Sequence, residues 1–486
     1  LLLESGLLGL LGGAAGLALA ALLLRSAPRL LPASFPRLDA VAIDLPVLLF
    51  ALGVSLASGL VFGLAPLWHA RRVDLRSALV GGDAAAGTTG RRLVAGPRSL
   101  VMAGQVAIAC VLLIGAALLG RSFLALLDAD LGYDPENVLT ARLVMPEHAI
   151  AEERRTEILD GVVARLRGIE GVRAAAVANL LPLTGGEALM SFGMPTEEDP
   201  EATAHAAVRT VGPGYFEALG LRLIEGRGLS DVDTATAPPA VVVNRAFVQR
   251  YLGADPVGFE LPLQSGEDGP GYRVVGVFED VRRQGAADEA IPEMVFSYQQ
   301  RAGGYGSSEA YLVARTAGDP AALTSTLRAL VREQDPIAVV ESVMTMEDRV
   351  WTSLAQPRLN ALLVAGFALF ALAIAGAGLF GVLSYSVAQR SREIGVRGAL
   401  GATSRDIVRL VLGQGLRIAV PGTLVGLVAA LWLVQALSGL LYGVAPRDPL
   451  SFVLVPVALV AVALLSFAIP ARRAAQIDPQ KVLRAS

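Results

Sequence analysis

Six segments of this sequence, each about 20 residues long, contain no charged side chain, and they restrict its fold more than any other feature. An α-helix of about 20 residues spans roughly 30 Å, the thickness of the hydrocarbon core of a bilayer. A charge at the centre of a membrane helix costs about 2.5 to 3.5 kcal/mol on insertion scales, so lipid selects segments without charge. The segments are 6–24, 46–67, 100–120, 361–385, 418–437 and 450–469.

Composition favours membrane helices over the alternative, a set of helices buried in a soluble core. Hydrophobic residues make up 53% of the chain, charged residues 17%, and the mean hydropathy is +0.55. Soluble domains typically contain fewer hydrophobic residues and about 25% charged residues. We therefore predict an α-helical transmembrane bundle with six spans.

The two ends of the chain resemble each other. Residues 1–7 (LLLESGL) recur as residues 410–416 (LVLGQGL), and Pro66 has a counterpart 404 positions later in Pro470. Duplicated hydrophobic hairpins are a layout of membrane proteins with repeated halves. Because the sequence starts inside the first copy, we expect it to be part of a longer protein.

Arginines beside the spans predict the orientation, because cytoplasmic loops of membrane proteins are rich in Arg and Lys. They crowd the links 68–99 and 386–417 and the C-terminal tail, which we place in the cytoplasm. The insert 121–360 then lies outside; it has 21 Arg against 35 Asp and Glu, a net charge of -14. Arginines 25, 29 and 37 fall on a loop assigned to the outside and do not fit this scheme.

The insert has the pattern of an α/β (α+β) domain. Apolar runs at 138–145 and 172–177 flank a helical pattern at 151–167, which predicts a βαβ unit. Asn244 is a candidate cap for a helix to residue 252, and Asp319 with Pro320 for a helix to residue 333. The spacing predicts two small lobes, with exposed loops at 184–200 and 264–271. The remaining predicted strands are 240–243, 272–278, 294–298 and 310–315.

Residues 387–402 form the most informative short segment. Ile394, Ala399 and Leu400 give it an apolar side, and Arg392, Glu393 and Arg397 give it a polar one. Such a helix lies along a membrane surface or in a groove of a partner, although a plain solvated helix has the same pattern. Gly401 is a candidate end for this helix, and Thr403 with Asp406 resembles a capping box for the next.

The run 392–397 (REIGVR), followed by 399–402 (ALGA), resembles the signature of MacB/FtsX-like ABC transporter permeases. In the outer insert, 213–220, 242–244, 255–258 and 274–277 resemble the MacB-like periplasmic core domain. Residues 1–82 are similar to the first half of the duplicated orphan permeases abbreviated ADOP. The resemblance implies that 387–402 is a coupling helix that docks on an ATPase. Its coupling residues would be Arg392, Glu393, Ile394, Gly395, Arg397, Ala399, Leu400 and Gly401.

The resemblance also implies a division of the chain. Residues 1–82 would be the C-terminal part of a first FtsX-like membrane domain with two spans, 83–99 a cytoplasmic linker and 100–120 a transmembrane helix. Residues 121–358 would be the periplasmic core domain, and 359–486 the second membrane domain with three spans. Six of eight expected spans would be present, so the chain would be N-terminally incomplete and its missing first half would complete an intrachain pseudo-dimer.

The sequence offers no set of catalytic residues. A P-loop needs a lysine, and the only lysine is Lys481 in the tail. The histidines 69, 148 and 205 lack metal-ligand spacing, and we interpret them, the carboxylate pairs 152–153, 197–198 and 288–289, and the pair Arg282 and Arg283 as surface residues. The single cysteine, Cys110, lies in the third span. We expect no cofactor in this chain, with ATP and Mg²⁺ on a partner.

Small residues are frequent in the spans: Gly366, Gly376, Gly378 and Gly381 in the fourth, and Gly53, Ser55, Ser58 and Gly59 in the second. They suit either close static packing or helices that slide.

We therefore expect a permease subunit in the cytoplasmic membrane that transmits the motion of a separate ATPase to the outer domain. The resemblance implies export or extraction of amphipathic cargo and, as further partners, a periplasmic adaptor or an outer-membrane channel; nucleic acid is not expected. An FtsX-like signalling subunit without transport is the alternative. A membrane-anchored hydrolase would need a nucleophile with a base, and the sequence shows no such set.

Overall fold

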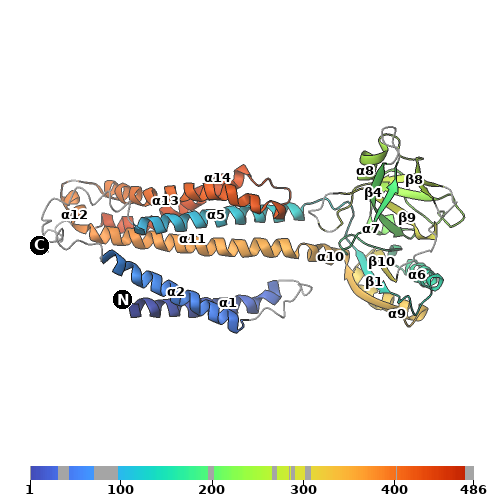
Figure 1. The fold of residues 1–486 in the computed structure, drawn as a ribbon, viewed down its shortest axis with the longest axis horizontal. Helices are drawn as coiled ribbons and strands as arrows, with labels where there is room; N and C mark the ends of the chain where they lie inside the picture. Colours follow the sequence, from blue (N-terminus) through green and yellow to red (C-terminus); the bar gives the residue numbers. More distant parts are fainter. Residues whose placement is uncertain are drawn as a thin grey trace. The chain divides into compact units, whose positions relative to one another are not determined.

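The computed structural model describes residues 2–30, 43–70, 97–194, 202–264, 271–283, 285, 290–300, 308–400 and 402–476 (Figure 1). The chain divides into two compact units. The membrane unit comprises Leu1–Ala125 and Ala355–Ser486, and the outer unit comprises Leu126–Leu354. Each unit has its own apolar core.

The membrane unit is helical. Four of its described helices are long and apolar enough to cross a bilayer: α5 (Pro97–Leu127), α11 (Ala355–Gln389), α13 (Ser404–Ala436) and α14 (Pro449–Ala475). The helices α1 (Leu2–Leu30) and α2 (Leu45–Ala70) contain the shorter apolar stretches Gly6–Leu22 and Leu45–Leu60. Four predicted spans thus coincide with candidate membrane helices, and the first two remain predictions.

The repeat is visible in how two helices begin. Asp44 accepts a hydrogen bond from the amide of Val47 (3.1 Å) before α2, and Asp448 accepts one from the amide of Ser451 (2.8 Å) before α14. Both aspartates are N-caps, which satisfy amides that the first helical turn leaves free. The two caps are 404 residues apart, the same spacing that relates Pro66 to Pro470.

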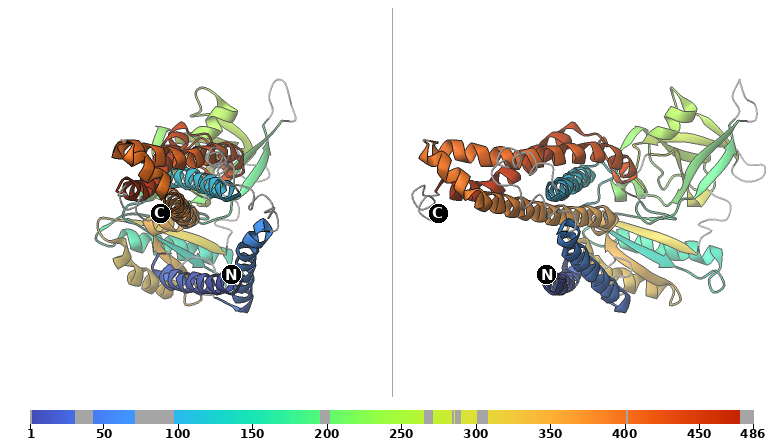
Figure 2. Two further views of the ribbon diagram at one scale, coloured as in Figure 1. Left: turned by 90° about the vertical axis from the view of Figure 1, so that its left-hand side faces the viewer. Right: turned by 60° about the vertical axis from the view of Figure 1, so that its left-hand side comes forward.

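Close backbone contacts hold the membrane bundle together. A β-carbon at Gly422 would lie 2.6 Å from the carbonyl oxygen of Ala103 on α5, and one at Gly426 would lie 2.6 Å from that of Ala107. Gly415 leaves room for the ring of Phe467 on α14, and both views of Figure 2 show α13 and α14 side by side. Small residues at this spacing let helices approach closely where lipid provides no hydrophobic drive.

The tightest glycine contacts lie outside the set singled out from the sequence. Around Gly366, Gly381 and Gly53 a β-carbon would meet no atom within 4 Å, whereas the fifth span supplies the tight contacts. Two members of the set do make close contacts: Ser55 lies against Gly13 and Gly9 of α1, and a β-carbon at Gly378 would lie 2.9 Å from the side chain of Gln105. Which glycine faces a neighbour depends on the rotation of each helix, which composition does not encode.

The outer unit is built on one sheet with eleven strands in the described residues, nine of them in the order β11-β1-β10-β2-β4-β9-β6-β8-β5. Strand β3 pairs with β4 and β7 with β8. The strands are β1 (Val138–Val144), β2 (Val172–Ala178), β3 (Leu189–Gly193), β4 (Thr203–Val211), β5 (Leu223–Gly226), β6 (Ala240–Asn244), β7 (Glu260–Gln264), β8 (Gly271–Phe278), β9 (Glu293–Ser297), β10 (Glu309–Thr316) and β11 (Val339–Thr345).

The predicted βαβ unit is present in a split form. Strand β10 lies antiparallel between β1 and β2, and β1 lies antiparallel between β10 and β11. With the helices α6 (Glu152–Arg167) and α9 (Thr324–Gln334), this gives two interlocked split βαβ units. Both helices bury their apolar faces on one side of the sheet, where Ile158, Val162 and Leu327 join a common core.

The residues between β2 and β10 form the second half of the sheet. Strand β4 runs parallel to β9, β6 antiparallel to β9, and β6 parallel to β8. The short helix α7 (Tyr215–Leu219) covers one face, and α8 (Arg245–Phe247) with a π-helical turn (Val248–Leu252) lies at the other core. The two halves join through one residue pair, Ala178 and Val211. Residues 126–354 form one compact unit. The structure therefore does not separate the two predicted lobes, which stay a prediction.

Two local predictions from the sequence were wrong in part. The interval 184–200 was expected to be a loop, but Leu189–Gly193 pairs with β4 as β3. The helix expected from Asn244 to residue 252 is α-helical for only three residues and then widens into a π-turn that ends at Gly253, whose φ is +69°. Residues 195–200 and 265–270 lie outside the described part of the chain.

Candidate functional site

The predicted coupling segment forms a separate short helix, α12 (Ser391–Ala399), between α11 and α13. Ile394 anchors it: only 4% of this residue is exposed, and it belongs to the same core as Leu383 of α11 and Val411 of α13. Gly395 is also buried. Helix α12 is therefore packed on α11 and α13 through Ile394.

The opposite face of α12 is exposed and mixed in character. Glu393, Val396, Arg397 and Leu400 follow the spacing i, i+3, i+4, i+7 of one helix face. Leu400 directly follows α12, and its amide still donates to the carbonyl of Val396 (3.0 Å), as in a helical turn. Glu393 pairs with Arg397 at 2.7 Å, and Leu400 is 83% exposed. We call these four residues the α12 face. Apolar side chains next to a charge pair suit a protein partner.

The structure divides the apolar side that the sequence suggested. Ile394 points into the bundle and Leu400 is exposed, so they do not share a face. Six residues at 100° each leave them about 120° apart around the helix. Arg392 and Ala399 lie within α12, although their side chains are not described, and Gly401 lies outside the described residues.

The predicted capping box after α12 is confirmed. The Thr403 hydroxyl accepts from the amide of Asp406 (3.4 Å), and the Asp406 carboxylate accepts from the amide (3.0 Å) and hydroxyl (2.7 Å) of Thr403. This reciprocal pair fixes the angle at which the chain enters α13. The corner between α12 and α13 is therefore a defined joint.

A polar cluster ties the C-terminal part of α5 to the N-terminal end of α14. Arg121 forms an ion pair with Asp448, and the hydroxyl of Ser122 accepts from the amide of Tyr442 (2.7 Å). Asp448 also accepts from Ser451, and this hydrogen bond, first among several contacts, lowers the pKa of its carboxyl. These bonds close the bundle at the end away from α12.

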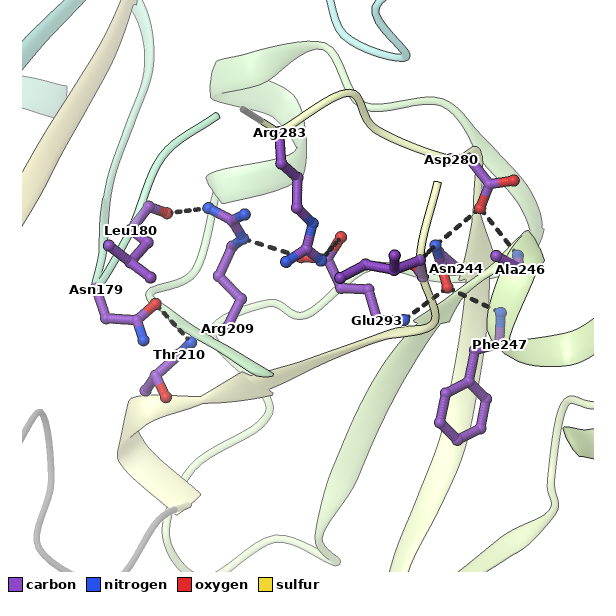
Figure 3. Close-up of polar contacts among 11 residues, drawn as sticks. Asn179, Leu180, Arg209, Thr210, Asn244, Ala246, Phe247, Asp280, Arg283 and Glu293 are labelled. Atoms are coloured by element: carbon purple, nitrogen blue, oxygen red, sulfur yellow. Dashed lines mark hydrogen bonds and ion pairs between the residues drawn. The ribbon is translucent and has the colours of Figure 1, made fainter. Parts of the chain in front are cut away.

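The outer unit contains a buried charge cluster of Arg209, Arg283 and Glu293 (Figure 3). Glu293 lies on β9 and receives Arg209 of β4 at 2.9 Å and Arg283, from the loop after β8, at 2.5 Å. The side chains of Glu293 and Arg209 are 3% and 5% exposed. Burial raises the pKa of Glu293, but the guanidiniums of Arg283 and Arg209 outweigh it and hold the pKa below its ordinary value.

Arg283 corrects a prediction from the sequence. It was expected to be a surface residue with Arg282, but it is buried against Glu293. The reason is electrostatic, because a buried carboxylate needs a counter-charge and Arg283 supplies one from a loop ten residues before it. The sequence did contain a signal for a buried charge cluster, because Arg209 and Glu293 are charged residues within otherwise apolar strands.

Asn244 extends the cluster and is the cap that the sequence predicted. Its side-chain oxygen accepts from the amides of Phe247 (3.0 Å) and Glu293 (2.8 Å), and its amide group donates to Asp280 (2.8 Å) and to the carbonyl of Ile291 (2.8 Å) (Figure 3). Burial raises the pKa of Asp280. Every polar atom of this amide is used, so the residue fixes β6, β9 and the loop after β8 in place.

Side chains also bridge the joint between the two halves of the sheet. The guanidinium of Arg167 on α6 donates to the carbonyls of Ala175 (3.0 Å) and Pro213 (2.5 Å), and the Tyr298 hydroxyl donates to Asp160 of α6. Burial, followed by this hydrogen bond, raises the pKa of Tyr298. The contacts reinforce a junction that has a single pair of strand residues.

These clusters are built to hold structure rather than to exchange protons. The lowered pKa keeps Glu293 ionised near neutral pH, and two guanidiniums occupy its oxygens. Among the described residues, no three His, Cys, Asp or Glu side chains are grouped as a metal site would require.

Two protein families match this chain. Residues 99–333 match the MacB-like periplasmic core domain, and residues 365–479 match the FtsX-like permease C-terminal domain. The first match covers most of the outer unit, and the second covers α12, α13, α14 and most of α11.

Curated relatives are similar over about two thirds of the chain. A macrolide export ATP-binding/permease protein MacB 1/2 of Paracoccus denitrificans is 28% identical over 327 residues, which are 64% of this chain and 46% of that protein. A pyoverdine export ATP-binding/permease protein PvdT of Pseudomonas syringae pv. tomato is 28% identical over 326 residues, with 63% and 46% covered. The chain therefore matches less than half the length of these relatives.

Solved structures include the periplasmic region of MacB from Actinobacillus actinomycetemcomitans, with 14% identity and a TM-score of 0.31 over 45% of this chain and 92% of that one. The extracellular domain of the noncanonic ABC-type transporter YknZ from Gram-positive bacteria aligns with 18% identity and a TM-score of 0.28, over 42% of this chain and 100% of that one.

Proposed function

We propose that this chain, a MacB-like and FtsX-like ABC permease, is the mechanical membrane subunit of an export system driven by a separate ATPase. The observation that carries the proposal is α12: Ile394 is buried in the bundle while Val396 and Leu400 of the α12 face are exposed. A rigidly mounted helix with an exposed mixed face is suited to receive a partner and to pass its motion on.

The direction of transmission follows from chain connectivity. Helix α11 begins one residue after the outer unit ends at Leu354 and ends directly before α12. A displacement of α12 therefore acts on the helix that continues into the outer unit. We place α12 in the cytoplasm and the outer unit beyond the cytoplasmic membrane, in line with the arginines beside the spans.

ATP binding by a second polypeptide is part of the proposal. The relatives named as ATP-binding/permease proteins join both roles under one name, and the chain matches less than half of their length. The sequence in hand has no glycine-rich loop with a lysine, and we propose that a separate ATPase supplies this part. We infer that ATP and Mg²⁺ bind to the partner and that the α12 face is where the partner docks. An adaptor or outer-membrane channel would contact the outer unit.

Export of amphipathic cargo is the transport activity that fits best, because two relatives are named for macrolide and pyoverdine export. An FtsX-like signalling subunit would use the same α12 face without moving cargo. ATP-dependent uptake of a macrolide or of pyoverdine into inverted vesicles separates these functions. Accumulation of the compound inside the vesicles supports export. ATP hydrolysis without accumulation of any tested compound supports signalling.

Docking is tested with Leu400→Asp, which places a charge at the most exposed apolar residue of the α12 face. The matched control is Leu189→Asp, the same change at an exposed position on β3 of the outer unit. Co-purification of an ABC ATPase with the tagged protein should fall at least tenfold for Leu400→Asp and stay unchanged for the control. Equal recovery of the ATPase with both variants would contradict docking at this face. Gly395→Arg is less suitable, because Gly395 is buried and the change disturbs packing.

A further inference from the structure

A groove of about 610 Å³ runs along one face of α13 and is closed on one side by Leu464 of α14. Its α13 residues follow helical spacing and change in character along the helix. Arg405 and Arg409 lie at one end, and Leu412, Gly413 and Leu416 at the other. The full lining is Ser404, Arg405, Val408, Arg409, Leu412, Gly413, Leu416 and Leu464.

The positions of the charge-free segments put the groove at the depth expected for the lipid headgroups. The charge-free segment of α13 begins at residue 418, and that of α14 ends at residue 469. Gly415 lies against Phe467, so these two segment ends lie at the same depth in the bundle. Leu412 and Leu416 are therefore at the edge of the hydrocarbon. Arg409 is about 6 Å further out than Gly413 at 1.5 Å per residue, which is within a headgroup layer of roughly 5 to 8 Å. Arg405 lies one turn beyond and has a long flexible side chain.

The two arginines are available for an anion. Both are exposed, and no described carboxylate lies within 4.0 Å of either one. Asp406, between them in sequence, accepts hydrogen bonds from Thr403, which with a weaker electrostatic contribution from Arg409 lower the pKa of its carboxyl; it forms no ion pair with Arg409 within 4.0 Å. Guanidinium groups match phosphate oxygens in geometry as well as charge, and basic pockets between membrane helices on the cytoplasmic side bind anionic lipid headgroups.

We propose that this groove binds one anionic phospholipid of the inner leaflet, with its phosphate at Arg405 and Arg409 and the start of an acyl chain against Leu412, Leu416 and Leu464. The orientation rests on the proposed function, which places α12 in the cytoplasm. Bound lipid would brace the corner between α12 and α13, because Ser404 follows the α12 face by four residues.

Gly413 gives a direct test of the apolar part. A β-carbon there would meet no atom within 4 Å, so Gly413→Leu adds apolar volume at a position with open space for its first carbon. Gly381→Leu on α11 is the matched control, because its β-carbon also has open space and Gly381 does not line the groove. Arg405→Gln with Arg409→Gln tests the headgroup part, and Arg472→Gln with Arg473→Gln removes two exposed charges at the end of α14 as its control.

Binding is measured on the full chain in detergent by native mass spectrometry, with phosphatidylglycerol and phosphatidylcholine as probes. We expect the wild-type protein to prefer phosphatidylglycerol. The Arg405/Arg409 double variant should bind it at least tenfold more weakly, and Gly413→Leu should weaken both lipids, while each control stays within twofold of the wild-type protein.

Three results would overturn the proposal: equal binding of the two lipids, equal losses in both arginine double variants, or unchanged binding by Gly413→Leu. The measurement needs neither an ATPase nor a defined orientation. Failure here therefore leaves the docking test with Leu400→Asp untouched, and failure of that test leaves this one untouched.

Discussion

Replacing Glu293 by Gln should destabilise the outer unit strongly, because the change removes one negative charge from between two buried guanidiniums. Gln keeps the shape of the side chain, so packing changes little. Removing one partner of a buried ion pair costs about 3 to 5 kcal/mol, whereas an exposed pair contributes about 0 to 1 kcal/mol. Glu293 and Arg209 are almost fully buried, so the larger range applies. A domain is stable by about 5 to 15 kcal/mol, and the variant should lose a large part of that.

The assay is urea unfolding of residues 126–354 produced separately, since this unit has its own cores. Circular dichroism and Trp351 fluorescence should report one transition. Glu260→Gln is the matched control: Glu260 pairs with Arg273 at 2.7 Å, but its side chain is 63% exposed. We expect a change under 1 kcal/mol for the control. A Glu293→Gln variant within 1 kcal/mol of the control would refute the reasoning.

Acid provides an independent check on the same cluster. The pKa of Glu293 is lower in the folded domain than its ordinary value, so the contribution of its charge is complete above that ordinary value, about 4.3. It is lost as pH falls through the folded pKa. The difference in unfolding free energy between the wild-type domain and Glu293→Gln should therefore be constant from about pH 7 to 5 and shrink in stronger acid. A difference that grows in acid would contradict the assignment.

Three further predictions concern packing, capping and the joint of the sheet. Gly426→Leu should lower the thermal midpoint of the full chain in detergent by several degrees, because its β-carbon would lie 2.6 Å from a backbone oxygen, while Gly381→Leu should not. Thr403→Ala should speed amide exchange in the first turn of α13 roughly fivefold, measured by mass spectrometry. Tyr298→Phe removes the hydrogen bond to Asp160 and should cost about 1 kcal/mol in urea unfolding of the outer unit; no change would show that water replaces it.

Local features of the fold were readable from the sequence because their causes are local. The caps at Asn244, Asp319 and Thr403 are all present, since each needs only a short polar side chain before a helical pattern. The helix at 152–167 and the strands beside it follow from periodicity over a few turns. The four long apolar helices follow from length and composition.

Features that depend on distant pairing were not readable. Strand β10 lies between β1 and β2 in the sheet, although about 130 residues separate β2 from β10 in the sequence. No local sequence pattern predicts that insertion. Arg283 was assigned to the surface because its partner Glu293 sits on a strand whose burial depends on the whole sheet. The candidate site shows the same limit, because the sequence located α12 but did not separate buried Ile394 from exposed Leu400.

Different forces stabilise the interior of each unit, and this difference is what the proposed mechanical role would require. The outer unit is fixed by directional bonds such as those of Glu293 and Asn244, which break when the geometry changes by a small distance. The membrane unit is held by shape, through contacts such as Gly426 on Ala107, and its described ion pairs lie at helix ends or on α12. In the proposed mechanism, a push on α12 would therefore meet mainly steric contacts between the helices of the bundle, whereas the outer unit would resist deformation through its directional bonds.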